Sequence, residues 1–520
     1  MLLETIDITI VISYAVMIII IAQYVSREKA GHDKNTKDYF LAGKSLPWWA
    51  IGASLIAANI SAEQIVGMSG SGYVIGLGIA SYEWTGAITL LIVGKYFLPI
   101  FLQNQIYSMP QFLEKRYDGR VRFVMAIFWL GLYIFVNLTS ILWLGALAIN
   151  TITGIEITSG LFILGGLAIA YSLYGGLKAV ALTDIIQVAL LVFGGLMVSS
   201  VALGQIGGDQ GIWGGFIELT ERLPEKFDMI LSSDSPYYKD LPGISVLIGG
   251  MWMMNLSYWG FNQYVIQRAL AAKSIHEARK GIVFACFLKI LMPVIVVLPG
   301  IAAALLVNDL KAPDQAYPEM MKLLPTGIKG LVFAALIAAI LSSLGSMMNS
   351  ISTIFTMDIY KTMHKNVSEH KLVTIGRITA ATAMVIAIII AKPLLGNFGQ
   401  AFQFIQEFTG FFTPGIVVIF LLGLFWKRAT ANSALVAGIG SFVFSILLRQ
   451  YWPELPFLDR VGVVFLLCGA LAILLSYIMP HHDMDNTIIT ENAEYQVDQS
   501  FRIGSICITA IIASLYIIWW

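Results

Sequence analysis

The sequence predicts an all-α integral membrane protein with about 14 transmembrane helices. The first supporting observation is composition, because 58% of the 520 residues are hydrophobic and only 12% are charged. Mean hydropathy is +0.78, above the range of ordinary soluble domains. The second observation is that apolar runs of spanning length recur along the chain. These lie near 5–25, 48–72, 80–102, 121–149, 158–175, 180–203, 245–267, 281–306, 329–357, 372–391, 396–425, 430–448, 460–479 and 502–520.

The first run is expected to remain in the protein as a helix, because it ends in a charged stretch without a small-residue cleavage site. Lysines and arginines gather in alternate loops, and such residues stay on the cytoplasmic side. The basic loops are 26–47, 115–122, 268–280, 361–377 and 427–428. Both termini are therefore expected outside the cytoplasm. A net charge of zero argues against a nucleic-acid partner and leaves membrane lipid as the surroundings.

Residues 54–76 are long enough to cross a bilayer but carry Asn59, Glu63, Gln64 and several glycines and serines. Lipid cannot satisfy such groups, so this segment must face protein, water or a ligand. A second interrupted span, 249–260, opens a later group of five helices. Paired interruptions of this kind are typical of inverted repeats that bind their substrate at the bilayer midplane.

Few charges lie inside the apolar runs. They are Glu63, Glu83, Lys95, Asp184, Lys289 and Glu407, with Asp358 at a helix end. Lys95 lies near the end of its run, where a long side chain can reach the interface. Glu83 and Lys289 lie deep, and an unpaired ion there would cost several kcal/mol. We therefore expect Glu83 and Lys289 to share one hydrated cavity, with a purely structural ion pair as the alternative.

Amides and aromatic residues accompany these two charges in the sequence. The amides and hydroxyl are Asn59, Gln64, Asn255, Ser257 and Gln406, and the aromatic residues are Tyr82, Trp84, Tyr258, Trp259 and Phe402. Planar amides and a carboxylate suit vicinal hydroxyls, while an aromatic face covers the C–H side of a pyranose ring. The inventory indicates a sugar. Any one of these side chains alone could instead bond between membrane helices.

Hydroxyl and amide side chains form a stripe at helical spacing within 329–357. Its members are Ser342, Ser343, Ser346, Asn349, Ser350 and Thr353. Such serines can bond to the preceding turn or allow close packing. If the stripe faces the break at residues 57–60, freed carbonyls and hydroxyls would form an oxygen site suited to sodium.

Five motifs spread over nearly the whole chain carry a family resemblance. They are the stretches 38–49 (DYFLAGKSLPWW), 58–64 (ANISAEQ), 174–177 (YGGL) and 262–268 (NQYVIQR), and the helix 331–360. Together they resemble the sodium/solute symporter family, most closely its bacterial sodium/galactose transporters.

The resemblance implies a leucine-transporter-type core of two inverted five-helix repeats with broken first helices. On this basis residues 1–47 form a peripheral helix and a cytoplasmic loop, and 48–203 form the first repeat. Residues 204–244 form an extracytoplasmic loop, 245–425 the second repeat, and 426–520 three peripheral helices.

The resemblance also implies which residues meet the ligands. The sugar contacts would be Asn59, Gln64, Glu83, Asn255, Lys289 and Gln406, with Tyr258 stacking on the ring as the inner gate. Met68, Tyr82 and Phe402 match residues that close the outer side. Sodium would be held by carbonyls of Ala57, Ile60 and Ala339 and by hydroxyls of Ser342 and Ser343. Asp184 matches a carboxylate on the sodium exit route. Gly86 departs from the pattern, because close relatives have a sugar-facing serine there.

The function expected from these features is sodium-driven symport of a neutral monosaccharide, galactose or glucose, across a bacterial plasma membrane by alternating access. Alternatives on the same fold are another solute, such as a polyol, organic anion or amino acid, or proton coupling through Asp184. A membrane sugar sensor would need a signalling domain, and none is visible. The chain carries no nucleophile, metal or cofactor motif, so it is not expected to be an enzyme.

Overall fold

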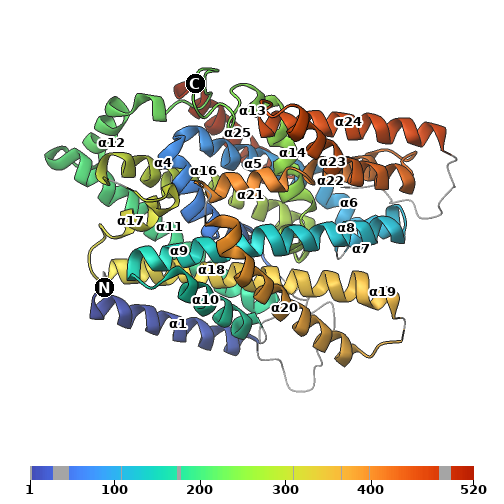
Figure 1. Ribbon diagram of the computed structural model, residues 1–520, viewed down its shortest axis with the longest axis horizontal. Helices are drawn as coiled ribbons and strands as arrows, with labels where there is room; N and C mark the ends of the chain where they lie inside the picture. Colours follow the sequence, from blue (N-terminus) through green and yellow to red (C-terminus); the bar gives the residue numbers. More distant parts are fainter. Residues whose placement is uncertain are drawn as a thin grey trace.

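The protein is a bundle of helices, most of which lie roughly side by side along one direction in the computed structural model (Figure 1). The structure describes residues 3–26, 46–106, 108–172, 177–308, 310–364, 366–396, 399–479 and 494–520. Within these residues there is no β-strand, and the one isolated bridge joins Leu46 to Ala272. The predicted all-α class is confirmed.

The helices of the first half begin with α1 (Thr5–Ser26) and α3 (Trp48–Asn59), followed by η2 (Glu63–Met68) and α4 (Ser69–Val74). They continue with η3 (Leu77–Ala80), α5 (Ser81–Ile92), η4 (Val93–Phe97), α6 (Leu98–Gln103), α7 (Met109–Arg116), α8 (Gly119–Gly131), η5 (Leu132–Leu138) and α9 (Thr139–Thr153). The last are α10 (Ile157–Ser172), α11 (Leu177–Gly207), η6 (Gly208–Gln210), α12 (Gly211–Arg222) and η7 (Pro224–Lys226). The expected outer loop 204–244 is thus partly helical.

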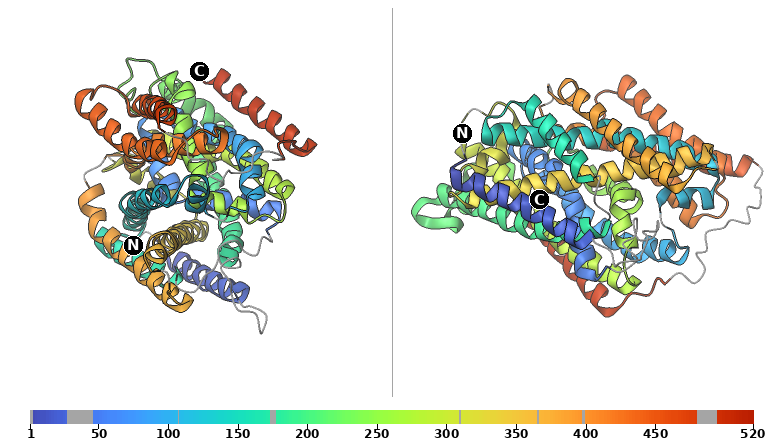
Figure 2. Two further views of the ribbon diagram at one scale, coloured as in Figure 1. Left: turned by 90° about the vertical axis from the view of Figure 1, so that its right-hand side faces the viewer. Right: turned by 90° about the horizontal axis from the view of Figure 1, so that it is seen from below.

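The helices of the second half begin with α13 (Ser245–Ile248), α14 (Gly250–Leu256), η8 (Ser257–Phe261), α15 (Gln263–Leu270) and α16 (Ile275–Leu306). They continue with η9 (Pro313–Gln315), α17 (Ala316–Met321), α18 (Ile328–Thr353), η10 (Ile354–Tyr360), α19 (Lys361–Met363) and α20 (Glu369–Leu395). The last are α21 (Ala401–Thr409), α22 (Thr413–Phe425), α23 (Ala431–Tyr451), α24 (Phe457–Ile478) and α25 (Gln499–Ile518). Figure 2 shows α25 on the periphery of the bundle.

Within the described residues, 9 helices are long and apolar enough to cross a membrane, or up to 11 if two bent pairs each count as one span. Shorter apolar stretches lie in α1 and α10. A multispanning membrane protein is therefore confirmed, while the count of 14 stays a prediction.

The first bent pair is α3 followed by η2 and α4, with an angle of 63°. At the break the Ser61 N–H turns to the Asn59 carbonyl at 2.9 Å, instead of the Ala57 carbonyl that a continuous helix would use. The Ser61 hydroxyl accepts from the Glu63 N–H at 3.1 Å. Short polar side chains thus compete with the helix ladder, and the break lies where the sequence predicts it.

The second interruption lies at Asn262, between η8 and α15, where the backbone is extended. Its side-chain oxygen accepts from the Tyr264 N–H at 3.3 Å and from the Tyr133 hydroxyl at 2.6 Å. Asn262 caps the resumed helix. The predicted segment 249–260 also contains a break, because the backbone leaves the helical conformation at Gly249, between α13 and α14.

A third bend, of 47°, separates α21 from α22. The sequence predicts one continuous run over 396–425, so this bend is a finding of the structure. It places α21, with Phe402 and Gln406, beside η2 at the level of the first break.

Close packing of α3 on α16 fixes the centre of the bundle. A Cβ atom at Gly52 would lie 2.7 Å from the Gly281 carbonyl oxygen, so neither position has room for a side chain without movement. Asn59 and Lys289 lie about two turns further along their helices. The packing therefore brings Lys289 to the broken end of α3.

Candidate functional site

A cavity of about 80 Å³ lies at the first break, between η2, α5, η5, η8, α16 and α21. This space is enough for several water molecules. All seven predicted substrate residues line it, namely Asn59, Gln64, Glu83, Asn255, Tyr258, Lys289 and Gln406. The structure thus collects in one place residues that are up to about 350 positions apart in the chain.

The centre of the cavity is an ion pair between Lys289 and Glu83, with 2.7 Å between Nζ and Oε2. Both side chains are only 1% exposed. The ammonium also donates to the Asn59 Oδ1 at 2.9 Å and lies 4.4 Å from the centre of the Trp259 ring. Such a pair cancels its own charge, so the cavity presents polarity without demanding a charged ligand.

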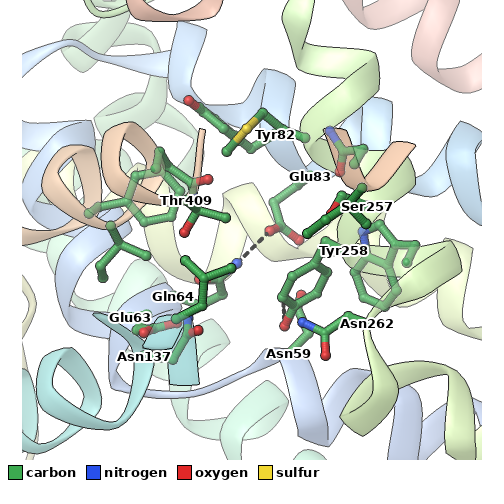
Figure 3. A pocket seen from close by; sticks show the side chains of 18 of the residues that line it. Asn59, Glu63, Gln64, Tyr82, Glu83, Asn137, Ser257, Tyr258, Asn262 and Thr409 are labelled. Carbon is green, nitrogen blue, oxygen red and sulfur yellow. Dashed lines mark hydrogen bonds between the residues drawn. The ribbon is translucent and has the colours of Figure 1, made fainter. Parts of the chain in front are cut away.

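Gln64 completes the contacts of Glu83. Its Nε2 donates to the second carboxylate oxygen, Oε1, at 3.2 Å, which is the dashed line in Figure 3. Glu83 is therefore held on both oxygens, one by an amide and one by an ammonium. A ligand hydroxyl that approaches this group meets a fixed carboxylate.

Tyr258 belongs to a hydrogen-bond relay that begins and ends on α3. The Asn59 Nδ2 donates to the Tyr258 hydroxyl at 3.4 Å. The Tyr258 hydroxyl in turn lies 2.8 Å from the Tyr264 hydroxyl. Because Tyr264 donates to the Ala58 carbonyl at 2.7 Å, the Tyr258 hydroxyl must be the donor between the two tyrosines. Movement of Tyr258 would break this relay. In Figure 3 Tyr258 and Asn59 lie beside each other, on the opposite side of Glu83 from Tyr82.

Two of the three residues expected to close the outer side lie at the cavity. Tyr82 and Phe402 line the cavity, and their rings meet edge to face with centres 5.2 Å apart. Met68 is fully buried but does not line the cavity.

Just before Phe402 in the chain, the Gln400 Oε1 accepts from the Ser71 hydroxyl at 3.0 Å, and the Ala401 N–H donates to the buried Asp314 carboxylate at 3.0 Å. The segment between α16 and α18 thus holds the start of α21, next to Phe402.

Sequence reasoning missed several residues of the cavity wall. Glu63, Asn137, Asn262 and Thr409 line it and are labelled in Figure 3. Glu63 stood out as a charge inside a span but had no assigned partner, and in the structure it lies next to Asn137. Nothing in the sequence placed Asn137 opposite the first break, because η5 joins the site only through tertiary packing.

Gly86 lies against the side chain of Lys289, next to the ion pair. A Cβ atom there would lie 2.9 Å from both the Asn255 Oδ1 and the Lys289 Cε, and 3.0 Å from the Trp259 Nε1. The glycine therefore makes room for the stem of Lys289.

The predicted sodium residues Ala57, Ile60, Ala339, Ser342 and Ser343 are all buried. The Ser343 Oγ has no hydrogen-bond partner among the described residues, and a buried hydroxyl without a partner is costly. The Ala57 carbonyl is released by the turn of the Ser61 N–H. Hydroxyl and carbonyl oxygens of this kind fit a hard monovalent cation. The side chain of Asp184, in α11, lies outside the described part of the structure.

Other deep charges have structural partners. Glu407 pairs with Arg460 at 3.1 Å and with Arg449 at 3.4 Å. Asp358 pairs with Arg122 at 2.7 Å. These pairs lie outside the cavity lining.

Comparison with known proteins supplies the decisive observation. The model of the sodium:solute symporter family matches residues 39–440. The chain belongs to the sodium:solute symporter family. It is therefore a membrane transporter, and the expectation that it is not an enzyme is confirmed.

Two relatives illustrate the range of similarity. A sodium/glucose cotransporter of Vibrio parahaemolyticus is 50% identical over 537 aligned positions, which cover 100% of this chain and 99% of the relative. A sodium/myo-inositol cotransporter 2 of Sus scrofa is 33% identical, covering 87% of this chain and 71% of the relative.

Solved structures agree on the fold. A sodium-coupled sialic acid symporter in a substrate-bound outward-open state has a TM-score of 0.79 at 23% identity, covering 92% of this chain and 98% of the other. A nucleobase-cation-symport-1 family transporter has a TM-score of 0.53 at 12% identity, covering 91% and 99%. These likenesses show a transporter fold.

Proposed function

We propose that this protein couples the entry of sodium to the uptake of a neutral hexose, glucose or galactose, across a bacterial plasma membrane. The observation that carries the proposal is the self-neutralised Lys289–Glu83 pair inside a cavity of amides and aromatic rings. An anionic solute would need an unpaired cation, and the ammonium of Lys289 already has its carboxylate. The full-length similarity to a sodium/glucose cotransporter supports the same substrate class.

The sugar occupies the cavity with its hydroxyls on Glu83, Gln64, Asn59, Asn255 and Gln406. Lys289 donates to a hydroxyl once the ligand competes with Asn59 for the ammonium. The Tyr258 ring stacks on the sugar and blocks the inner side, while Tyr82, Phe402 and Met68 close the outer side. Charge-assisted hydrogen bonds from hydroxyls to a fixed carboxylate are stronger than neutral ones, so Glu83 contributes most to affinity.

Sodium binds between the Ala57, Ile60 and Ala339 carbonyls and the Ser342 and Ser343 hydroxyls. The ion joins α3 to α18 and so favours the outward-open state, in which the sugar residues on α3 and η2 are in place. After the outer side closes, the inner side opens and separates α3 from α18. Sodium therefore leaves first, by way of Asp184, and the sugar follows when Tyr258 moves.

The membrane potential supplies the driving force. One charge that moves through 100 mV releases about 2.3 kcal/mol. This alone supports roughly fifty-fold accumulation of a neutral sugar, because 1.4 kcal/mol corresponds to a factor of ten.

The architecture we propose has 14 spans, with inverted repeats at 48–203 and 245–425 flanked by peripheral helices. The interruptions at Ser61 and Asn262, one in each repeat, support it. The distribution of basic loops supports a location of both termini outside the cytoplasm. Membrane lipid surrounds the apolar side chains exposed on α20, α24 and α25.

The test is uptake of labelled sugars into proteoliposomes that contain the purified protein. We expect an inward sodium gradient, but not a potassium gradient, to drive accumulation of glucose or galactose. Uptake that ignores sodium and follows pH would instead indicate proton coupling. Because relatives named for myo-inositol are 33% identical, the panel includes this polyol as the second candidate, and a preference for it would replace the hexose.

A further inference from the structure

The Arg268 guanidinium joins three segments in the centre of the bundle, and neither the sugar site nor the sodium site uses it. Its side chain is buried, at 2% exposure. The Nε donates to the Ser54 hydroxyl of α3 at 3.0 Å, and the Nη2 donates to the Ser346 hydroxyl of α18 at 3.4 Å. The Nη1 donates to the Tyr264 carbonyl within α15. One side chain on α15 thus connects the two helices that hold the proposed sodium site.

The position of this connection relative to the sodium residues follows from the helix register. Ser54 precedes Ala57 by three residues on α3, and Ser346 follows Ser343 by three on α18. Three residues correspond to about 4.5 Å along a helix axis. Arg268 therefore contacts both helices about one turn away from the sodium residues.

Contacts along α15 show on which side of the proposed sodium site Arg268 lies. Tyr264 contacts Ala58, Arg268 contacts Ser54, and the Lys273 N–H donates to the Leu46 carbonyl at 3.3 Å. The two helices thus run antiparallel, and Arg268 lies toward the start of α3. The adjoining basic loop, 26–47, makes this the expected cytoplasmic side.

We propose that Arg268 is a positioning residue that latches α3 to α18 on the inner side of the sodium site. The latch holds the inner route closed while sodium and sugar are bound, and it must release Ser54 or Ser346 before the ion can leave. This inference rests on the proposed function, because it assigns a step of sodium-coupled transport.

The chemistry of the side chain fits this role. A guanidinium presents donors on a planar fork and can reach acceptors on three segments at once, whereas a lysine has one nitrogen and no fork. Arg268→Lys therefore keeps the positive charge but loses the simultaneous contacts. The substitution separates the bridging role from a purely electrostatic one.

The experiment compares Ser54→Ala, Ser346→Ala, the double variant and Arg268→Lys in proteoliposomes. We expect each to raise the external sodium concentration for half-maximal sugar uptake by about tenfold, the factor for one lost charge-assisted hydrogen bond. A weaker inner latch favours the inward-open state and so reduces the fraction competent for external sodium. The double variant should show no larger shift than either single one, because each breaks the same bridge.

Ser350→Ala is the matched control. This serine is also buried on α18, but its hydroxyl donates to the Ser346 carbonyl on the same helix, at 3.1 Å. We expect its sodium dependence to equal that of the wild type. Deuterium exchange provides a second readout, because peptides 48–59 and 263–270 should exchange faster in the sodium-free latch variants and recover when sodium is added.

An unchanged sodium requirement in Ser346→Ala and Arg268→Lys would overturn the latch. An equal shift in the control Ser350→Ala would also overturn it, as would a double variant whose shift is the product of the two single shifts. Wild-type protein measured in parallel keeps the two proposals apart. If the wild type shows no sodium-driven uptake, the proposed function fails. If the wild type transports normally and the variants are unshifted, only the latch fails.

Discussion

Replacement of Lys289 by alanine probes the centre of the cavity most sharply. The ammonium lies 2.7 Å from the Glu83 carboxylate and 2.9 Å from the Asn59 amide oxygen. Both charged side chains are 1% exposed. After truncation Glu83 would keep only the hydrogen bond from Gln64, and its charge would be left without an ammonium.

The magnitude follows from this geometry. Removal of one partner of a buried ion pair costs about 3–5 kcal/mol, since an uncompensated charge remains. The orphaned Asn59 oxygen adds about 1 kcal/mol. This cost lowers the stability of the sugar-free protein as well as that of the complex. The sugar itself loses the ammonium donor and a fixed Glu83, and one lost charge-assisted hydrogen bond weakens affinity about tenfold or more, so we expect sugar uptake by Lys289→Ala to fall below detection.

The assay separates stability from transport with a second variant. Glu83→Gln combined with Lys289→Met removes both charges while keeping the volume. We expect the double variant to recover most of the thermal stability lost in Lys289→Ala, measured in detergent, while sodium-driven sugar uptake stays abolished. Lys95→Ala serves as the control, because Lys95 lies outside the cavity with its ammonium 4.9 Å from the Tyr96 ring centre.

Two results would refute this reasoning. Normal uptake by Lys289→Ala would remove the ion pair from the substrate site. Normal uptake by the doubly neutral variant would show that polarity at this position is unnecessary, and that the pair only joins α5 to α16.

Three further predictions concern the sodium site, Gly86 beside the Lys289 side chain, and Asp314 in the segment between α16 and α18. Ser343→Ala should raise the sodium requirement for half-maximal uptake about tenfold with little loss of stability, because its hydroxyl has no partner among the described residues; an unchanged sodium titration would contradict the site. Gly86→Ala should weaken sugar binding severalfold, because the added Cβ displaces Lys289. Gly131→Ala is the control, since a Cβ there meets nothing within 4 Å, and it should bind sugar like the wild type. Equal sugar affinities of the two variants would show that a Cβ at Gly86 does not displace Lys289. Burial raises the pKa of Asp314 to about 7, although the hydrogen bond from the Ala401 N–H acts in the opposite direction. A free aspartate has a pKa of about 4, so the unfolded chain loses this proton at lower pH than the folded protein does. The free energy of unfolding should therefore fall as pH rises from about 4 to about 7. Asp314→Asn should flatten that part of the stability profile, and a profile with the wild-type slope would count against the assignment.

The first break shows how far sequence reasoning reaches. Asn59 and Ser61 are short polar residues inside an apolar run, and the cost of such groups in lipid predicts both an interruption and a site. The same cost predicts that Glu83 and Lys289 share one cavity although they are separated by 206 positions. These inferences are strong because an unpaired buried charge has few stable alternatives.

Most of the remainder depends on tertiary packing that no local pattern encodes. The bend between α21 and α22 does have a local signal, because Gly410 ends α21 and Pro414 lies in the first turn of α22, but the length of the apolar run hid it. By contrast, π-helical turns such as η5 leave no periodic signature. Arg268 lies in a motif that supported the family resemblance, but its partners Ser54 and Ser346 lie 214 and 78 positions away. The roles of the sodium residues, the exit route through Asp184 and the helix count remain predictions.

The most direct test of sodium–sugar coupling uses a sugar gradient to drive sodium entry, instead of a sodium gradient to drive sugar uptake. Because coupling between two ligands is reciprocal, an inward sugar gradient across proteoliposomes with equal sodium on both sides should drive net entry of labelled sodium. We expect sodium entry that rises with the sugar gradient in the wild type and is absent in Lys289→Ala. Sodium movement that is the same with and without the sugar gradient would contradict it.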